Sequence, residues 1–457
     1  MVKALRSWWE ESERWYFVVG LANLVLGTSS VLIPLSIDKV FKLSVASIGL
    51  LASLASLVGV LGSLLWGRLA DAAHRRKPFI VLGYTAAGLC FLGISMATSF
   101  HQLALFNMLL NFFWVANASV TVLLVIENSQ EGLWERKIGH LNQIGALGWV
   151  LGLAIGALWM YWMPSILGET AAIRVLFWGI GLSGLVASML AILSIPRTVP
   201  RFTQRKFRGL LLEMGSFISE RARFAPLHLY HRLHPKRIIA QWRSPEGFRL
   251  GTKRFLLSTV FSFVAMGFFG IPLPMLLSQR FGLSSSTVFL FFVIQHLGIV
   301  LAYPLASRRI RRLGNRYVQM GALGARTLLF ASFALYLAFF NDSPHAVILA
   351  AAFVVYGISW SYFQLSGTAL TSRLASEENR GLALGLYNAI AGTGWIIAGI
   401  GSGQIAARFG YSVTFAIASG LLVISVLILL TVPDPSTIDP AASLLDTPQD
   451  ESPLELG

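Results

Sequence analysis

The chain has few charged residues, a single cysteine and no acidic residue at mid-depth of any long apolar run. Of its 457 residues, 12% are charged, whereas soluble domains usually carry about a quarter. Such a deficit is expected where most side chains face lipid or other apolar helices. Because the only cysteine, Cys90, lies inside an apolar run, the sequence excludes a disulfide framework and a cysteine-based metal cluster.

Long apolar runs fill the sequence instead, and 55% of the residues are hydrophobic. A helix that spans a membrane needs about 20 mostly apolar residues. The first run meets this length, so we interpret it as a spanning helix and not as a cleaved signal peptide. The sequence therefore predicts an all-α, polytopic membrane protein with twelve transmembrane helices, at 16–37, 46–67, 78–99, 102–126, 139–162, 172–195, 255–278, 285–306, 316–340, 345–370, 381–404 and 411–432.

The basic residues predict how these helices are oriented. The net charge is +15, with 36 Lys and Arg. If the N-terminus lies inside, the inner segments hold 30 of these 36 and the outer loops hold five. This positive-inside pattern predicts a plasma-membrane protein with both termini in the cytoplasm. Since the basic residues fall between apolar runs and not on a soluble surface, we expect a lipid bilayer as partner and no nucleic acid.

The runs divide the chain into two halves joined by a basic segment. Within that segment, apolar and basic residues alternate at helical spacing between 205 and 223, which fits either a helix in the headgroup layer or a solvated linker helix. The acidic tail has too few apolar residues to form a core and is expected to be disordered. The predicted parts are a six-helix bundle (1–195), a linker (196–254), a second six-helix bundle (255–432) and the tail (433–457).

The two halves also share a sequence pattern. The fifth run contains Gly139-x-x-Asn142-x-Ile144-x-x-x-Gly148-Trp149. The same pattern recurs 246 residues later, in the eleventh run, as Gly385-x-x-Asn388-x-Ile390-x-x-x-Gly394-Trp395. Repeated halves are typical of secondary transporters, which rock one bundle against the other around a site at mid-depth.

The loop between the second and third runs reads Gly67-Arg-Leu-Ala-Asp71-Ala-Ala-His74-Arg75-Arg76-Lys77. It resembles the loop motif of the major facilitator superfamily, G-x-x-x-D-(R/K)-x-G-(R/K)-(R/K)-(R/K), with departures at the sixth and eighth positions. The resemblance extends over about 16 to 432. It implies a carrier with six plus six helices, without a bound cofactor, a metal or enzymatic chemistry. It also implies a gating role for Gly67, Asp71, Arg75 and Arg76, joined by Glu127; alternatively, the basic residues only set the topology.

By the same resemblance, the first, fourth, seventh and tenth helices line the substrate path. Independently of it, these runs carry polar and aromatic residues at helical spacing. Amides that face lipid would be costly, so we expect them to face the bundle interior. The alternative is that some amides only bond neighbouring helices. The expected substrate contacts are Asn23, Asn107, Asn111, Trp114, Ser262, His296, Tyr356, Trp360 and Gln364.

His296 and Arg326 are ionisable side chains that lie deep inside apolar runs. His296, beside Gln295, could carry a coupling proton, bind an anion or bond another helix as a neutral side chain. A buried arginine costs about 2.5–3.5 kcal/mol on insertion scales. We therefore expect Arg326, in the ninth run, to extend toward the inner membrane surface.

These observations predict a monomeric secondary transporter that moves a small organic solute by alternating access. With amide and aromatic walls and no buried acid, a neutral or mildly amphipathic substrate fits better than a polycation. Efflux of a hydrophobic, drug-like compound is the first hypothesis, and uptake of a sugar or another metabolite is the second. A receptor with a transporter fold and a membrane-bound enzyme are less favoured, because the sequence contains neither a long soluble sensory domain nor a histidine–aspartate cluster.

Overall fold

A computed structural model describes residues 13–72, 76–127, 134–195, 248–340, 344–376 and 379–433. Nearly all of these residues are helical. The helices are, in chain order, α2 (Arg14–Lys39), α3 (Val45–Ala72), α4 (Lys77–Met96), α5 (Phe100–Glu127), α6 (Trp134–Leu167), α7 (Glu169–Ser194), α11 (Leu250–Gly270), α12 (Leu273–Met275), the π-helix η2 (Leu276–Arg280), α13 (Ser285–Leu313), α14 (Asn315–Phe339), α15 (Ala346–Leu374) and α16 (Arg380–Leu430).

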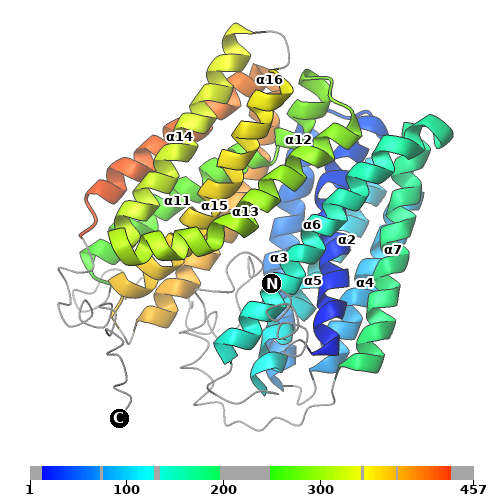
Figure 1. Cartoon of the computed structure of the whole chain (residues 1–457), viewed down its shortest axis with the longest axis horizontal. Coiled ribbons are helices and arrows are strands. Elements are labelled where there is room, and N and C mark those ends of the chain that lie inside the picture. The colour runs from blue at the N-terminus through cyan, green and yellow to red at the C-terminus, as the bar shows by residue number, and fades with distance from the viewer. Residues whose placement is uncertain are drawn as a thin grey trace, which may run out of the picture.

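The helices form two bundles that lie side by side (Figure 1). α2 to α7 make the N-terminal bundle, and α11 to α16 make the C-terminal bundle. The second bundle begins earlier than predicted, because residues 250–254, assigned above to the linker, form the first turn of α11. The amphipathic segment 205–223 and nearly all of the acidic tail lie outside the described residues.

Ten helical stretches of the described residues are long and apolar enough to cross a membrane, which confirms the predicted fold class. One of them, α16, has 51 residues and combines the eleventh and twelfth predicted runs. Gly410 separates its two parts with a φ of 86°, which only glycine adopts readily. The first part of α16 runs parallel to α11 and the second part antiparallel to it, so the chain reverses at this glycine.

The seventh predicted run is broken near its end. α11 stops at Gly270, and α12 and η2 follow after a short turn. Pro272 and Pro274 lie in this stretch, and proline cannot donate the backbone hydrogen bond that a continuous helix needs. The break positions Ser278 and Gln279 of η2 next to the end of α2.

The repeated glycine pattern packs equivalent helix pairs in the two bundles. In the N-terminal bundle, a Cβ added to Gly148 of α6 would lie 2.1 Å from the backbone oxygen of Gly20 on α2. In the C-terminal bundle, a Cβ added to Gly394 of α16 would lie 2.8 Å from Cβ of Phe263 on α11. Small residues thus allow close backbone approach at the same place in both halves.

Both bundles have their first and last described residues at one end, which we call the termini end. Basic side chains bond the backbone oxygens of helix C-termini there. Lys77 donates to Ile195 (2.9 Å), Arg254 to Thr431 (2.8 Å) and Arg316 to Leu430 (2.7 Å). Cations at helix C-termini are favourable because they complement the helix dipole. The other end of the molecule is called the opposite end below.

Candidate functional site

Between the bundles, α3 and α16 are in backbone contact near the opposite end. A Cβ added to Gly49 would lie 2.3 Å from the backbone oxygen of Gly399, and one added to Gly403 would lie 2.9 Å from Cα of Gly49. The hydroxyl of Ser53 donates to the backbone oxygen of Ile396 at 2.8 Å. The glycines leave no room for a side chain between these helices, so the bundles are closed here.

A second cross-bundle contact joins α6 to α13. Gly156 lies against the ring of Phe289, and a Cβ added to the glycine would lie 2.4 Å from that ring. At mid-depth, Trp149 stacks on His296 with ring centroids 5.8 Å apart and planes 21° from parallel. His296 Nδ1 lies 2.9 Å from the backbone oxygen of Phe292 in its own helix. His296 is therefore at the bundle interface, and its role in carrying a coupling proton stays a prediction.

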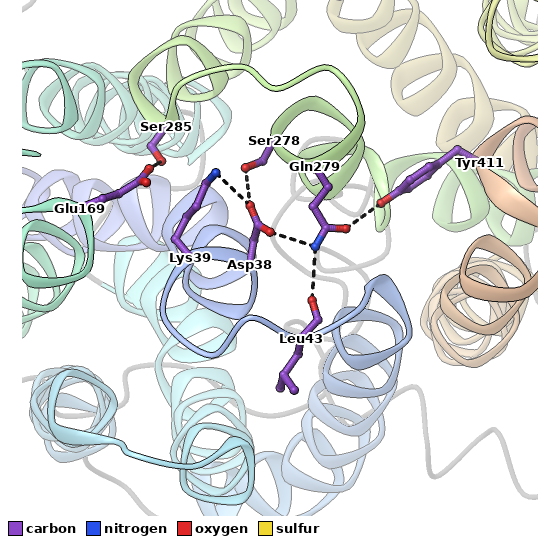
Figure 2. A network of polar contacts seen from close by, with 8 residues as sticks. All are labelled: Asp38, Lys39, Leu43, Glu169, Ser278, Gln279, Ser285 and Tyr411. Carbon is purple, nitrogen blue, oxygen red and sulfur yellow. Dashed lines mark hydrogen bonds and ion pairs between the residues drawn. The ribbon is translucent and has the colours of Figure 1, made fainter. Parts of the chain in front are cut away.

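A polar network spans the opposite end (Figure 2). Asp38, at the end of α2, accepts hydrogen bonds from Ser278 (2.5 Å) and Gln279 (2.9 Å) of η2. Gln279 also donates to the backbone oxygen of Leu43 (3.3 Å) and accepts from the hydroxyl of Tyr411 (3.3 Å). One carboxylate of the N-terminal bundle thus accepts two bonds from the C-terminal bundle, and bonds to a charged acceptor are the stronger kind.

A second carboxylate makes a similar contact beside this network. Ser285, the first residue of α13, donates its hydroxyl to Glu169 at 2.6 Å, and Glu169 is the first residue of α7. Figure 2 shows this pair next to Asp38 and Lys39. Together with the α3–α16 contact, these bonds join the bundles at the opposite end.

The predicted substrate contacts of the N-terminal bundle lie on two helices. Asn23 of α2 is 3% exposed, and its amide nitrogen donates to the backbone oxygen of Val19 in the same helix. Its side-chain oxygen has no hydrogen-bond partner among the described residues. On α5, Asn111 donates to the backbone oxygen of Asn107 at 2.8 Å. Trp114 follows one turn later and is partly exposed.

The predicted contacts of the C-terminal bundle differ in their surroundings. Gln364 of α15 is 4% exposed. In the part of the chain that the structure describes, neither its side-chain oxygen nor that of the buried Gln295 on α13 has a hydrogen-bond partner. Ser262 of α11 lies 2.6 Å from the hydroxyl of Ser425 and donates to Ser258 of its own helix. The hydroxyl of Ser262 is engaged in pairing α11 with α16, and contact with substrate there stays a prediction.

Arg326 does not extend to a membrane surface, so that expectation was wrong. It lies at mid-depth of α14 with no exposed surface. Its Nη2 donates to the backbone oxygen of Tyr356 at 2.9 Å. The guanidinium lies over the rings of Tyr356 (4.7 Å) and Trp360 (5.1 Å), two of the predicted substrate contacts. These rings and the carbonyl group draw the side chain into the bundle instead of along its surface.

The arrangement of two repeated bundles around this interface agrees with the comparisons with known proteins. The model of the Major Facilitator Superfamily matches residues 15–244 and 255–448. The chain belongs to the Major Facilitator Superfamily. This confirms the resemblance inferred from the loop motif.

Individual superfamily members show how far the likeness extends. Nucleoside permease NupG of Escherichia coli (strain K12) is 28% identical over 125 residues, 25% of this chain and 29% of the permease. The crystal structure of nucleoside transporter NupG matches 92% of this chain and 98% of its own, at 16% identity and a TM-score of 0.66. The crystal structure of a bacterial homologue of the human lysosomal transporter Spinster, inward-facing and occupied, matches 94% of this chain and 97% of its own. The identity is 14% and the TM-score is 0.65. These structures share the superfamily fold.

The superfamily loop motif is only partly described. Gly67 and Asp71 lie in the last turns of α3 and Glu127 is the last residue of α5; the side chains of these three residues lie outside the described part. Arg75 is also outside it, and Arg76 precedes α4 as its N-cap residue. Their gating role stays a prediction.

Sequence reasoning missed the network at the opposite end. Asp38 and its partners Ser278 and Gln279 were not among the residues expected to have a role. The repeat could have indicated this contact, because the first and seventh runs are equivalent helices, each the first of its half. Polar residues at the ends of both predict contact across the interface.

Proposed function

We propose that this superfamily member takes up a small, polar, ring-containing metabolite by alternating access. In this proposal the termini end faces the cytoplasm, as the positive-inside pattern predicts. The contacts of Gly49 with Gly399, and of Asp38 with Ser278 and Gln279, then close the outer side. We therefore assign the conformation to the inward-facing half of the transport cycle.

The substrate class is inferred from a set of buried side-chain amide oxygens that accept no hydrogen bond from any described residue. They belong to Asn23 on α2, Gln295 on α13 and Gln364 on α15. A buried acceptor left unpaired costs about 1–3 kcal/mol, so a ligand with hydroxyl or N–H groups gains by bonding it. The partly exposed rings of Trp114 and Trp360 suit stacking on a planar ring. A nucleoside has both features, and the nucleoside permease is among the relatives found.

Export of a hydrophobic compound is the second candidate. The same exposed indoles, Trp114 and Trp360, favour it, because large apolar rings bind hydrophobic solutes without hydrogen bonds. The unpaired amide oxygens argue for the first candidate, since a hydrophobic substrate would leave them unsatisfied.

Uptake assays separate the two candidates. Cells that produce the protein are given labelled uridine, adenosine or glucose, and uptake is compared with cells carrying an empty vector. Gln364→Leu replaces the buried amide with an apolar side chain of similar size. The variant should lower the uptake rate about tenfold, which corresponds to the loss of one buried hydrogen bond between protein and substrate. Gln404→Leu, at an exposed position on α16, is the control and should leave uptake unchanged. If no polar solute accumulates while a hydrophobic dye is expelled, the export hypothesis replaces this one.

A further inference from the structure

The C-terminal bundle contains a buried positive charge without a countercharge of its own. Arg326 is 0% exposed and lies near the middle of α14. The sequence from 255 to 432 has three acidic residues, Asp342, Glu377 and Glu378, and all three fall between the predicted spans. A charged side chain at this depth is expensive and usually marks a path for substrate or ions.

The contacts of Arg326 satisfy its guanidinium only in part. Nη1 donates to the thioether sulfur of Met266 (2.8 Å), which is a weak acceptor. Nη2 donates to the backbone oxygen of Tyr356, and Nε has no hydrogen-bond partner within the described part of the chain. A neutral side chain could join α11, α14 and α15 without the penalty of burying a charge. Packing alone therefore does not explain why an arginine occupies this position.

Two aromatic rings cover the guanidinium of Arg326. The guanidinium is stacked against Tyr356 and Trp360, and of these three side chains Trp360 is the one that is partly exposed. A ligand that stacks on the free face of Trp360 would be separated from the guanidinium by the thickness of one indole ring. Rotation of this indole would open the guanidinium to the ligand, and a guanidinium can donate two parallel hydrogen bonds to a carboxylate or a phosphate.

We propose that Arg326 makes this carrier selective for small organic anions, with the planar part of the substrate on Trp360 and its anionic oxygens directed to the guanidinium. The proposal rests on the proposed transport of a polar, ring-containing solute and adds the sign of its charge. The substrate supplies the countercharge that the C-terminal bundle lacks.

Matched pairs of ligands test the sign of the charge in the wild-type protein. Purified protein is titrated at pH 7 with orotidine and uridine, orotate and uracil, and nicotinate and nicotinamide, and stabilisation is followed by thermal unfolding. The first member of each pair carries a carboxylate that the second lacks. We expect the acid of at least one pair to stabilise the protein with a dissociation constant at least tenfold lower than that of its neutral partner.

Variants then test whether Arg326 is responsible. Arg326→Lys keeps the charge and should keep the preference for the acid, whereas Arg326→Gln should abolish it. Arg311→Gln removes an exposed cation on α13, whose side chain donates to the hydroxyl of Ser307 at 2.8 Å, and should leave the preference intact. If Arg326→Gln does not fold, the comparison of acidic and neutral ligands in the wild-type protein and in Arg326→Lys still tests the proposal.

The outcomes separate this inference from the proposed function. Equal or tighter binding of the neutral members, or an acid preference that survives in Arg326→Gln, overturns the role of Arg326 and leaves the carrier proposal standing. If no member of any pair stabilises the protein, the anion proposal is overturned, and the uptake assay above then decides independently whether the protein carries a polar solute.

Discussion

In both bundles a glycine of the repeated pattern brings two helices into backbone contact: Gly148 against α2 and Gly394 against α11. The polar groups inside the bundles differ. Both bundles bury amides, such as Asn23 in the first and Gln364 in the second, but among the described residues the C-terminal bundle adds a linked serine cluster and a buried arginine. The comparison shows that the repeat preserves the packing, while the buried polar chemistry has diverged.

This division has a physical reason. Close helix contact depends only on the absence of a side chain, so the same glycine serves in either half. Binding a solute depends on which donors and acceptors face it, and two identical halves would present the same groups twice. We infer that packing positions are shared because both bundles must move as rigid units, and that polar positions differ because one asymmetric substrate contacts both.

The largest expected effect tests the shared packing. Gly148→Ala places a Cβ 2.1 Å from the backbone oxygen of Gly20, so α2 and α6 must separate. Overpacking typically destabilises by about 1–3 kcal/mol and occasionally by more, and a clash with backbone as close as this one belongs at the upper end. Gly394→Ala, the equivalent change, meets Phe263 at 2.8 Å and should destabilise less. Thermal unfolding of the purified variants measures both.

Gly139→Ala is the matched control, because it lies in the same helix as Gly148 and none of the described residues lies within 4 Å of its added Cβ. Alanine is favoured over glycine inside a helix by about 0.5–1 kcal/mol, so this variant should be slightly more stable. Equal stability of Gly148→Ala and Gly139→Ala would contradict the close approach of α2 and α6.

An intermediate effect tests the closed end, where the two bundles meet through unlike groups. Asp38→Asn keeps the size of the side chain but removes the charge that accepts from Ser278 and Gln279. Hydrogen bonds to a charged group contribute about 1.5–3 kcal/mol, so the opposite end should open at least about tenfold more often. A cysteine replacing Ser53, between α3 and α16, reports opening through its rate of alkylation in a Cys90→Ala background.

Lys39→Gln provides the comparison for that experiment. Lys39 lies 3.4 Å from Asp38 but has an accessible side chain, and exposed ion pairs contribute about 0–1 kcal/mol. Alkylation of the cysteine at position 53 should change little in this variant. A rate in Asp38→Asn that matches the parent protein would show that the network does not hold the end closed.

The smallest effect compares hydroxyl contacts within the bundles. Ser188 bonds the hydroxyl of Thr85 (2.6 Å) and the backbone oxygen of Val81 (3.2 Å) in the N-terminal bundle. Ser425 meets the hydroxyls of Ser258 (2.8 Å) and Ser262 (2.6 Å) and the backbone oxygen of Ser258 (3.0 Å) in the C-terminal bundle. Hydrogen bonds between membrane helices contribute about 0.6 kcal/mol on average. Ser425→Ala should therefore lower the unfolding temperature more than Ser188→Ala. The reverse order would argue against the serine cluster as a specific feature of the C-terminal bundle.

Much of the fold could be predicted because lipid imposes a simple rule on the chain. A spanning segment must satisfy its backbone internally, so apolar length alone located the helices. Their ends were less accurate: α13 continues past the predicted boundary at 306 to Leu313, and the proline break in the seventh run was not foreseen. Apolar length cannot report where a helix bends, because prolines are tolerated inside spanning segments.

The candidate site was predicted less well. Tyr356 and Trp360 were recognised from their spacing, but the arginine stacked on them was assigned to the membrane surface. Ser262 was grouped with substrate contacts, and the structure places its hydroxyl beside Ser425. In each case the sequence identified a polar face, and the partner came from another helix, which the spacing within one run does not report.

The sequence by itself determined that the chain crosses a membrane repeatedly, that its two halves are related and that it belongs with the superfamily carriers, because these properties follow from composition, periodicity and short patterns. Only the tertiary structure decided which residues meet across the interface. Asp38 and Ser278 are 240 residues apart, and Arg326 is 60 residues from Met266. Such contacts depend on how helices are arranged in three dimensions, which the local order of residues does not encode.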